Sequence, residues 1–296
     1  MKSSFSSYHP IVQAVYFFIV MLFTMFIMHP IMLVISLVSA FCYAVYLGRR
    51  NSIMIFVKFV LPMSVMVGIL NPLFNHAGVT ILMYLPDGNP LTLESLIFGC
   101  VSGAMFSSVM LWCICLQHIM SSDRVIYLFG RITPRLGLMI SMILRFIPKL
   151  SSQFRRIRAG QKCIGRDITQ GSFFTRIKNG VRMVSMLVQW SLENSVDTAD
   201  SLKSRGYGLP HRTSFSLFRF CFRDAVMLVF TAVFGTVVLV SLLTERLDFF
   251  YYPCISEIEN SFADIAVYTI FLMLCIMPLM ADIKEDRKWN VLRSKI

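Results

Sequence analysis

Thiols and imidazoles build most metal centres and many nucleophilic sites, and this sequence spaces them widely. Cys113 and Cys115 are the only close pair among the eight cysteines, whereas a zinc site needs two paired clusters of Cys or His. Most of the cysteines lie in apolar runs, where a thiol behaves as a small hydrophobic group. The five histidines stand apart from one another, at His9, His29, His76, His118 and His211. The sequence therefore predicts no metal site and no cofactor.

The common catalytic motifs do not occur in this sequence either. It contains no Gly-x-x-x-x-Gly-Lys phosphate-binding loop, no His-Glu-x-x-His zinc motif and no Gly-x-Ser-x-Gly nucleophile motif. Any nucleotide hydrolysis on which the protein depends must then take place in another chain. We expect a protein without catalytic residues, not an enzyme.

The chemistry that the sequence does offer is basic. Residues 121–223 contain 18 lysines and arginines against five acidic residues, a net charge of +13, while the whole chain carries +12. An arginine at a helix end presents a planar fork of donors that suits a carboxylate in a partner's cleft. Arg205, which Gly206 follows, is an arginine of this kind. An Arg-Gly pair by itself also fits the ordinary basic end of a helix. Because the arginines alternate with apolar residues between apolar segments, we expect no nucleic acid as a partner.

The rest of the chain must position this basic segment, and its composition points to a membrane. The sequence is 56% hydrophobic and 15% charged, whereas soluble domains average about 45–50% and about 25%. The predicted fold class is therefore all-α: a polytopic membrane protein with five to six transmembrane helices and amphipathic helices outside the bilayer. The predicted spans are Ile11–Met28, Ile31–Leu47, Ile53–Leu70, Ile97–Gln117, Ala225–Leu243 and Asp264–Ala281. His29-Pro30 separates the first two, which predicts a tight hairpin, with one long kinked helix as the alternative.

The placement of Lys and Arg between the spans predicts the orientation. Arg49-Arg50 follow the second span and the end of the chain is basic, whereas Asn71–Leu96 contains neither Lys nor Arg. The Thr244–Ala263 segment has four acidic residues against Arg246 alone. Since cytoplasmic loops carry the excess of positive charge, we predict that both termini and the basic segment are cytoplasmic. The chain then divides into N-terminal spans (1–120), a basic cytoplasmic region (121–223) and C-terminal spans with a basic tail (224–296).

Two amphipathic helices are predicted in the basic region. The first lies around Leu136–Gln161 and is interrupted or kinked at Pro148. The second helix begins after Ser172, which is its predicted N-cap, and its last turn is the basic Lys203–Arg205. Gly206 then supplies the left-handed residue that ends the helix. Its apolar residues recur in steps of three and four, at Phe174, Ile177, Val181, Val184, Val188 and Leu192. This face needs a surface to cover it: a membrane interface, another helix of the chain or a partner's groove.

Several motifs resemble those of a known family. They are Arg145–Pro148, Gln161–Asp167 and above all Ala199–Gly208, followed by Arg212-Thr213. The layout of the chain is also similar, with spans first, then basic helices, then further spans. In these motifs and this layout the chain resembles the T component of energy-coupling-factor transporters, the EcfT/CbiQ family. That family carries two Ala-Arg-Gly triplets, each at the end of a cytoplasmic coupling helix. The second stands here as Ser204-Arg205-Gly206.

The first triplet departs from the family pattern. It stands here as Cys163-Ile164-Gly165, with isoleucine where the family has arginine, and Arg166 follows one position past the glycine. Arg166 can replace the missing arginine only if the backbone turns it by about 100° more, the rotation of one helical residue. The resemblance implies that both tips, Cys163–Arg166 and Ser204–Gly206, are partner-binding residues.

The resemblance also implies a set of partners. It predicts two ABC ATPase subunits that receive the tips, and a membrane-embedded S component that binds a vitamin or metal ion and is reoriented by the coupled motion. It places the protein in the cytoplasmic membrane of a bacterium or archaeon, where the basic region also contacts lipid headgroups. The alternative is a stand-alone membrane transporter or a membrane-embedded lipid enzyme. The spans contain few ionisable residues, which argues against a self-powered transporter.

Overall fold

The structure is a computed structural model of the chain that describes residues 4–84, 90–132, 134–169, 172–207, 218–244, 246–256 and 261–293. It divides into two compact units: the first comprises Met1–Val125 with Phe218–Ile296, and the second Ile126–Leu217. Each is described by itself below. The described residues are overwhelmingly helical, which confirms the predicted all-α membrane fold.

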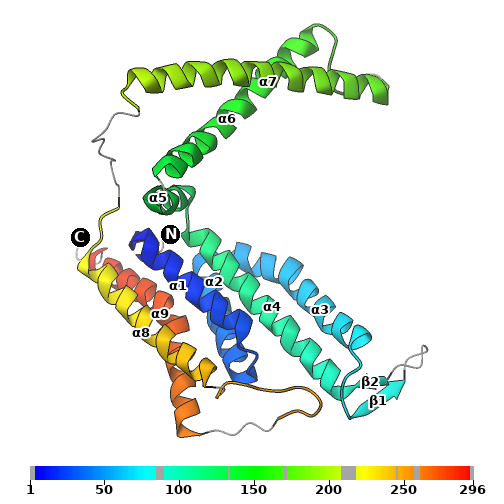
Figure 1. Cartoon of the computed structure of the whole chain (residues 1–296), viewed down its shortest axis with the longest axis vertical. Coiled ribbons are helices and arrows are strands. Elements are labelled where there is room, and N and C mark those ends of the chain that lie inside the picture. Colours follow the sequence, from blue (N-terminus) through cyan, green and yellow to red (C-terminus); the bar gives the residue numbers. More distant parts are fainter. Residues whose placement is uncertain are drawn as a thin grey trace. The chain divides into compact units, whose positions relative to one another are not determined.

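The first unit is a bundle of apolar helices (Figure 1). Its elements are a 3₁₀ turn (Ser4–Ser7), α1 (Pro10–Phe26), α2 (Pro30–Ile55), a π-helical segment (Phe56–Val60), α3 (Leu61–Phe74), β1 (Ile81–Tyr84), β2 (Pro90–Thr92), α4 (Leu93–Ile119), α8 (Phe222–Leu243) and α9 (Phe262–Arg293). Five segments among the described residues are long and apolar enough to cross a membrane: Pro30–Gly48, Ser52–Phe74, Leu93–Ile119, Phe222–Leu243 and Phe262–Trp289. Helix α1 is apolar but shorter, with 17 residues.

The predicted break between the first two spans is present. Helix α1 ends at Phe26, and the backbone at Ile27 and His29 is extended before α2 begins at Pro30. The alternative of one kinked helix is therefore wrong. Proline at the first helical position explains the restart, because its missing N–H is not needed there.

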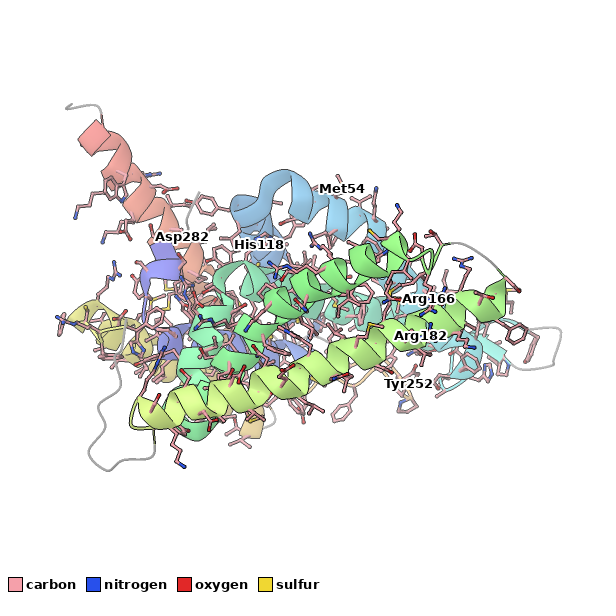
Figure 2. The ribbon with its side chains drawn as sticks, turned by 90° about the horizontal axis from the view of Figure 1, so that it is seen from above. Met54, His118, Arg166, Arg182, Tyr252 and Asp282 are labelled. Carbon is pink, nitrogen blue, oxygen red and sulfur yellow. The ribbon has the colours of Figure 1, made fainter. Side chains whose placement is uncertain are left out.

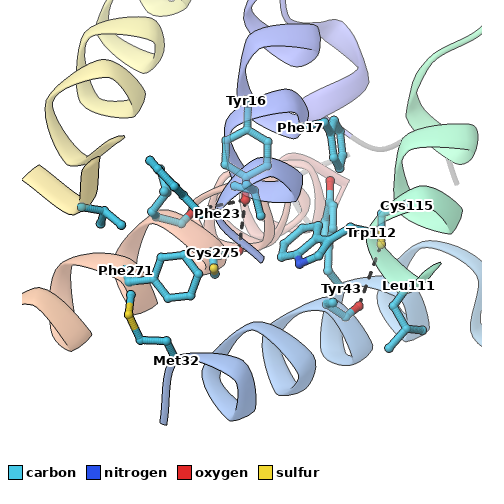
Figure 3. Close-up of a cluster of buried hydrophobic side chains, with 14 of the residues drawn as sticks. Tyr16, Phe17, Phe23, Met32, Tyr43, Leu111, Trp112, Cys115, Phe271 and Cys275 are labelled. Carbon is cyan, nitrogen blue, oxygen red and sulfur yellow. Dashed lines mark hydrogen bonds between the residues drawn. The ribbon is translucent and has the colours of Figure 1, made fainter. Parts of the chain in front are cut away.

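Aromatic rings from several helices form the core of this unit, as Figure 3 shows. The indole of Trp112 on α4 lies 6.3 Å from the ring of Tyr16 and 6.2 Å from that of Phe17, both on α1, in edge-on arrangements. The Tyr16 hydroxyl donates to a main-chain carbonyl of α9 at 3.1 Å. Tyr43 of α2 and Phe271 of α9 are fully buried beside them. These rings lock α1, α2, α4 and α9 into one body.

Two buried carboxylates tie the N-terminal segment to the later helices. Asp224 at the start of α8 accepts a hydrogen bond from the main-chain N–H of His9 at 3.1 Å. Asp282 near the end of α9 accepts from the main-chain N–H of Phe5 at 2.5 Å and from the Tyr43 hydroxyl at 3.2 Å. Buried charges persist where such donors satisfy them. The sequence pattern alone had not marked either residue.

Helices α3 and α4 approach closely through small residues. A Cβ atom added at Gly99 would lie 2.5 Å from the carbonyl oxygen of Gly68, and one at Gly103 would lie 2.6 Å from that of Ser64. Glycines four residues apart thus let two backbones meet, as small residues commonly do in membrane helix pairs. Most other residues of α3 are exposed in this chain. Lys58, in the π-helical segment before α3, is exposed as well.

Candidate functional site

The second unit consists of the C-terminal part of α5 (Ser122–Ile132), α6 (Pro134–Cys163) and α7 (Phe173–Ser204). Figure 1 shows α6 and α7 as a pair of long helices joined by a short turn. The rings of Phe146 and Trp190 stack with centroids 6.0 Å apart, and the Lys149 ammonium lies 5.5 Å from the Trp190 ring. Lys149 also donates to the side chain of Asn194. These contacts join the two helices into a single structural pair.

Helix α6 runs through Pro148 without interruption. Of the two outcomes predicted there, the interruption is therefore wrong, and the kink stays a prediction. A proline inside a helix removes one N–H donor, and the stacking of Phe146 on Trp190 beside it supports the helix at this point.

The second predicted tip ends α7 in a Schellman motif. The N–H of Gly206 donates to the Lys203 carbonyl at 3.0 Å, and the N–H of Tyr207 donates to the Leu202 carbonyl at 3.0 Å. Gly206 has a φ of 75°, which confirms the left-handed residue predicted from the sequence. Arg205 is the cap residue, and its side chain is exposed.

The first predicted tip ends α6 with the same motif. The N–H of Gly165 donates to the Lys162 carbonyl at 3.0 Å, and the N–H of Arg166 donates to the Gln161 carbonyl at 2.9 Å. Gly165 also has a φ of 75°. The two hydrogen bonds and the glycine conformation repeat those of the second tip, so the two triplets share one backbone design.

The shared backbone fixes which residues of the two tips correspond. Ile164 takes the cap position that Arg205 takes in the second tip, and Arg166 takes the position of Tyr207. The additional rotation that would bring Arg166 into the role of Arg205 does not occur. Ile164 is 65% exposed, and Cys163 and Arg166 are exposed as well. Figure 2 labels Arg166 in the turn that follows α6.

The carboxylate of Asp167, the last residue of the Gln161–Asp167 motif, fixes the turn after the first tip, a role that the sequence did not indicate. Asp167 is buried, and it accepts hydrogen bonds from the Thr169 hydroxyl at 2.6 Å and the Ile168 N–H at 2.7 Å. The Arg158 guanidinium lies 3.5 Å away. The Thr169 hydroxyl, the Ile168 amide and Arg158 together lower the pKa of Asp167, against the opposing effect of its burial. The amide of Asn179 on α7 donates to the Asp167 main-chain carbonyl at 3.3 Å.

The apolar face predicted on the second helix is present, and α6 does not cover it. Its members are Phe174, Ile177, Val181, Val184, Val188 and Leu192, and all are exposed. Helix α6 packs instead on the opposite side of α7, where Met183 is fully buried and Met186 contacts the Gln161 amide. Within the described residues of this unit, no other helix covers the apolar face. Ser172 stands at the predicted N-cap position, without a side-chain capping bond.

The last residues of the family motif, Gly208, Arg212 and Thr213, lie outside the described residues. Among the described residues, no group of three or more Cys, His, Asp or Glu side chains is placed to hold a metal ion.

The fold and the tips define a class: a polytopic membrane protein whose basic helical pair ends in two matching glycine-terminated caps. The sequence model of the CbiQ family, described as cobalt transport protein, matches residues 1–215. The chain belongs to this family.

Proteins named energy-coupling factor transporter transmembrane protein EcfT are similar to parts of the chain. That of Listeria innocua is 34% identical over 119 residues, which cover 40% of this chain and 44% of the relative. That of Bacillus selenitireducens is 30% identical over 121 residues, covering 40% and 45%. That of Lactococcus lactis is 35% identical over 95 residues, covering 32% and 36%. The matched stretches span less than half the length of these relatives. Like these relatives, which are named transmembrane proteins, the chain has apolar helices that are long enough to cross a membrane.

Proposed function

We propose that the chain is the non-catalytic coupling subunit of an energy-coupling-factor importer. The observation that carries the proposal is the pair of matching Schellman tips on one helical pair, one of them presenting Arg205 at its cap. In this role the tips dock into two ABC ATPase subunits. The spans hold a membrane-embedded S component that binds a vitamin or metal ion.

The helical pair suits the transmission of motion between separate bodies. From Asn179, which contacts the turn of the first tip, to Arg205 at the second, α7 extends roughly 40 Å at about 1.5 Å per residue. The stacked Phe146 and Trp190 rings support the pair between these ends. When two ATPases that hold the tips approach each other on binding ATP, both ends are displaced together. That displacement passes to the S component through the helices.

Arg205 supplies the specific contact in this proposal. Its guanidinium is exposed in the chain alone, where pairing with a carboxylate is worth about 0–1 kcal/mol. Enclosed at the centre of an interface, the same pairing becomes a hot spot worth about 2 kcal/mol or more on truncation. Membrane lipid contacts the flanking basic residues in the same assembly.

The test is charge reversal at the second tip. We expect Arg205→Glu to weaken ATPase binding by about thirtyfold or more, which corresponds to about 2 kcal/mol, or to uncouple ATP hydrolysis from uptake. Lys203→Glu is the matched control, because it reverses an exposed charge in the same helical turn outside the triplet. Pull-down of the ATPases and uptake by proteoliposomes measure both effects. Full transport by the chain reconstituted alone would refute the proposal.

A further inference from the structure

The chain passes between the two units at two places, which we call the crossings. It leaves the first unit after Val125 and returns to it at Phe218. Arg124 lies just before the first crossing, in the first turn of α5, and Arg223 lies just after the second, in the first turn of α8. Both arginines contact the same short stretch at the start of the chain, residues 4–13. These contacts all lie within the first unit.

The first crossing is tied to residues 4–13 through one buried amide. The Gln13 side chain is fully buried, and its Nε2 donates to the main-chain carbonyls of Phe5 at 2.6 Å and of Tyr8 at 3.1 Å. Its Oε1 accepts a hydrogen bond from the Arg124 guanidinium at 3.3 Å. Arg124 also donates to the Ile119 carbonyl at the end of α4. A buried amide that uses both its donor and its acceptor in this way holds its partners in a fixed geometry.

The second crossing is tied to the same stretch through Arg223. Its guanidinium lies 4.2 Å from the centroid of the Tyr8 ring and donates to the Ser7 hydroxyl at 2.9 Å. It also lies 3.7 Å from the carboxylate of Glu285 on α9. A cation in the first turn of a helix is opposed by the positive end of the helix dipole, so these contacts offset an unfavourable position. The next residue, Asp224, accepts a main-chain hydrogen bond from residues 4–13 as well.

Residues 4–13 are themselves fixed in the bundle. The Phe5 ring is fully buried, with its centroid 5.7 Å from that of Tyr16 and 6.2 Å from that of Phe17, both on α1. The Phe5 N–H donates to the buried carboxylate of Asp282 on α9. A displacement of this stretch therefore disturbs α1 and α9, because close-packed side chains cannot move independently.

We infer that residues 4–13 are a clamp that holds both crossings against the bundle. In this clamp Gln13, Arg124 and Arg223 are positioning residues for the coupling motion. A displacement at one crossing then passes to α1, to α9 and to the other crossing, because packed side chains and hydrogen bonds connect all of them. Without the clamp, the same displacement is absorbed where it arises. The role in coupling rests on the proposed function, whereas the clamp itself is a property of the chain alone.

The clamp is tested by changing one crossing and observing the other. The readout is hydrogen exchange of the purified chain in lipid nanodiscs, measured by mass spectrometry. The amides of Arg124 and Val125 donate to the Ser121 carbonyl at the start of α5. Arg223→Ala should speed their exchange about threefold or more. Arg219→Ala is the matched control, because it removes an exposed arginine from the stretch that leads into α8, and it should change this exchange less than about 1.5-fold.

The reverse substitution should act in the reverse direction, because coupling between two sites is reciprocal. Arg124→Met should speed the exchange of the Cys221 amide, which donates to the Asp224 carboxylate at 2.9 Å. Tyr8→Leu, which removes the ring that faces Arg223, should act like Arg223→Ala. Tyr8→Phe keeps the ring and should exchange like the wild type. Changes of exchange that stay confined to the altered crossing would overturn the inference.

The coupling role is tested in the complex that the chain forms with the ATPases of its source organism. Exchange at the main-chain N–H groups of Phe5 and His9, both held by buried carboxylates of the bundle, is compared between ADP and a non-hydrolysable ATP analogue. The two states should differ by about twofold or more in the wild type. They should not differ in Arg223→Ala, which should still bind the ATPases, and Arg219→Ala should keep the difference.

The outcomes separate the clamp from the proposed function. A nucleotide response that is absent from the wild type, or that persists in Arg223→Ala, would contradict the coupling role and leave the proposed function standing. If the wild-type chain binds no ATPase, the proposed function itself fails. The exchange measurements on the chain alone then still decide whether the clamp exists.

Discussion

Gly165 and Gly206 each have a φ of 75°, a conformation that costs other residues roughly 1–2 kcal/mol. The sequence was sufficient to predict this at Gly206, because a basic last helical turn precedes it. At Gly165 the sequence aligned Ile164 with the arginine of the family triplet but left open whether Arg166 turns into that position. The backbone hydrogen bonds answer this, because they give Ile164 the same cap position as Arg205. The departure from the family pattern therefore changes side-chain chemistry and leaves the tip geometry unchanged.

Substitution of Gly165 tests this geometry. Gly165→Ala should destabilise the first tip by about 1 kcal/mol, because alanine is strained at positive φ. The amide of Arg166, which donates to Gln161 in the motif, should then exchange its hydrogen roughly fivefold faster. Gly160→Ala is the control. A Cβ added at Gly160 or at Gly165 meets no other atom within 4 Å, so the two substitutions differ only in backbone conformation, and Gly160 lies inside α6. It should stabilise the helix by up to about 1 kcal/mol; equal effects at both sites would contradict the assignment.

Asp167 makes the first tip sensitive to acid. Its hydrogen bonds with Thr169 and Ile168 and its ion pair with Arg158 lower the carboxyl pKa below the ordinary 3.8. A lowered pKa in the folded state adds stability that is fully present above the unfolded pKa and is lost as pH falls through the folded pKa. A spin label on the exposed Cys163 should therefore become more mobile below pH 3.8.

The isosteric Asp167→Asn variant is the comparison for this effect. Its label should already be more mobile than that of the wild-type chain at pH 7, because the charge is absent at every pH. The difference between the two chains should shrink as the wild-type carboxyl is protonated. A constant difference across the range would show that Asp167 does not act through its charge.

At the scale of helices, one buried hydroxyl joins three elements of the bundle. Ser36 on α2 lies 2.9 Å from the Thr24 hydroxyl of α1 and 2.8 Å from the Ser108 hydroxyl of α4. The indole N–H of Trp112 donates to Ser36 at 3.0 Å. Polar side chains in membrane bundles can connect helices in this way, since lipid offers no competing partner.

Ser36→Ala should destabilise the bundle by about 1–2 kcal/mol, because it leaves the Trp112 N–H buried without its acceptor. Ser107→Ala is the control: Ser107 is also buried, on α4, but its hydroxyl donates to the Gly103 carbonyl of its own helix at 3.0 Å. It should cost about half a kcal/mol or less. Unfolding of the purified protein in mixed micelles measures both. Equal losses would mean that Ser36 does not link the helices.

Helix boundaries followed from the sequence where strong local signals exist. The break at His29-Pro30 and the N-cap position of Ser172 are present as predicted, and the predicted spans agree with the observed apolar helices. Features that depend on distant partners did not follow. The pairing of β1 with β2 places Ile81 opposite Thr92, although neither strand has a pattern longer than four residues. The side of α7 that packs on α6 carries Met183 and Trp190, and the longer apolar stripe that marked the helix in the sequence lies on its other side.

At the scale of the whole chain, composition was enough to predict a membrane protein, and the order of apolar and basic segments pointed to its family. The separation of Ile126–Leu217 as a compact unit follows from packing between α6 and α7. The division of the chain into 1–120, 121–223 and 224–296, with the middle region cytoplasmic, stays a prediction. It depends on charge, because the bilayer that would orient the helices acts from outside the chain.

Two native cysteines test this orientation. Cys163 belongs to the region predicted to be cytoplasmic and Cys254 to the acidic segment predicted to face outward, and both are exposed. In chains that keep one of these two with the buried Cys115 and Cys275, a membrane-impermeant maleimide should label Cys254 in intact cells. It should reach Cys163 only after the membrane is opened, because the charged reagent does not cross lipid. Cys221, which precedes α8 and is also exposed, should behave like Cys163. Labelling of Cys163 from outside would reverse the topology and remove the tips from any cytoplasmic ATPase.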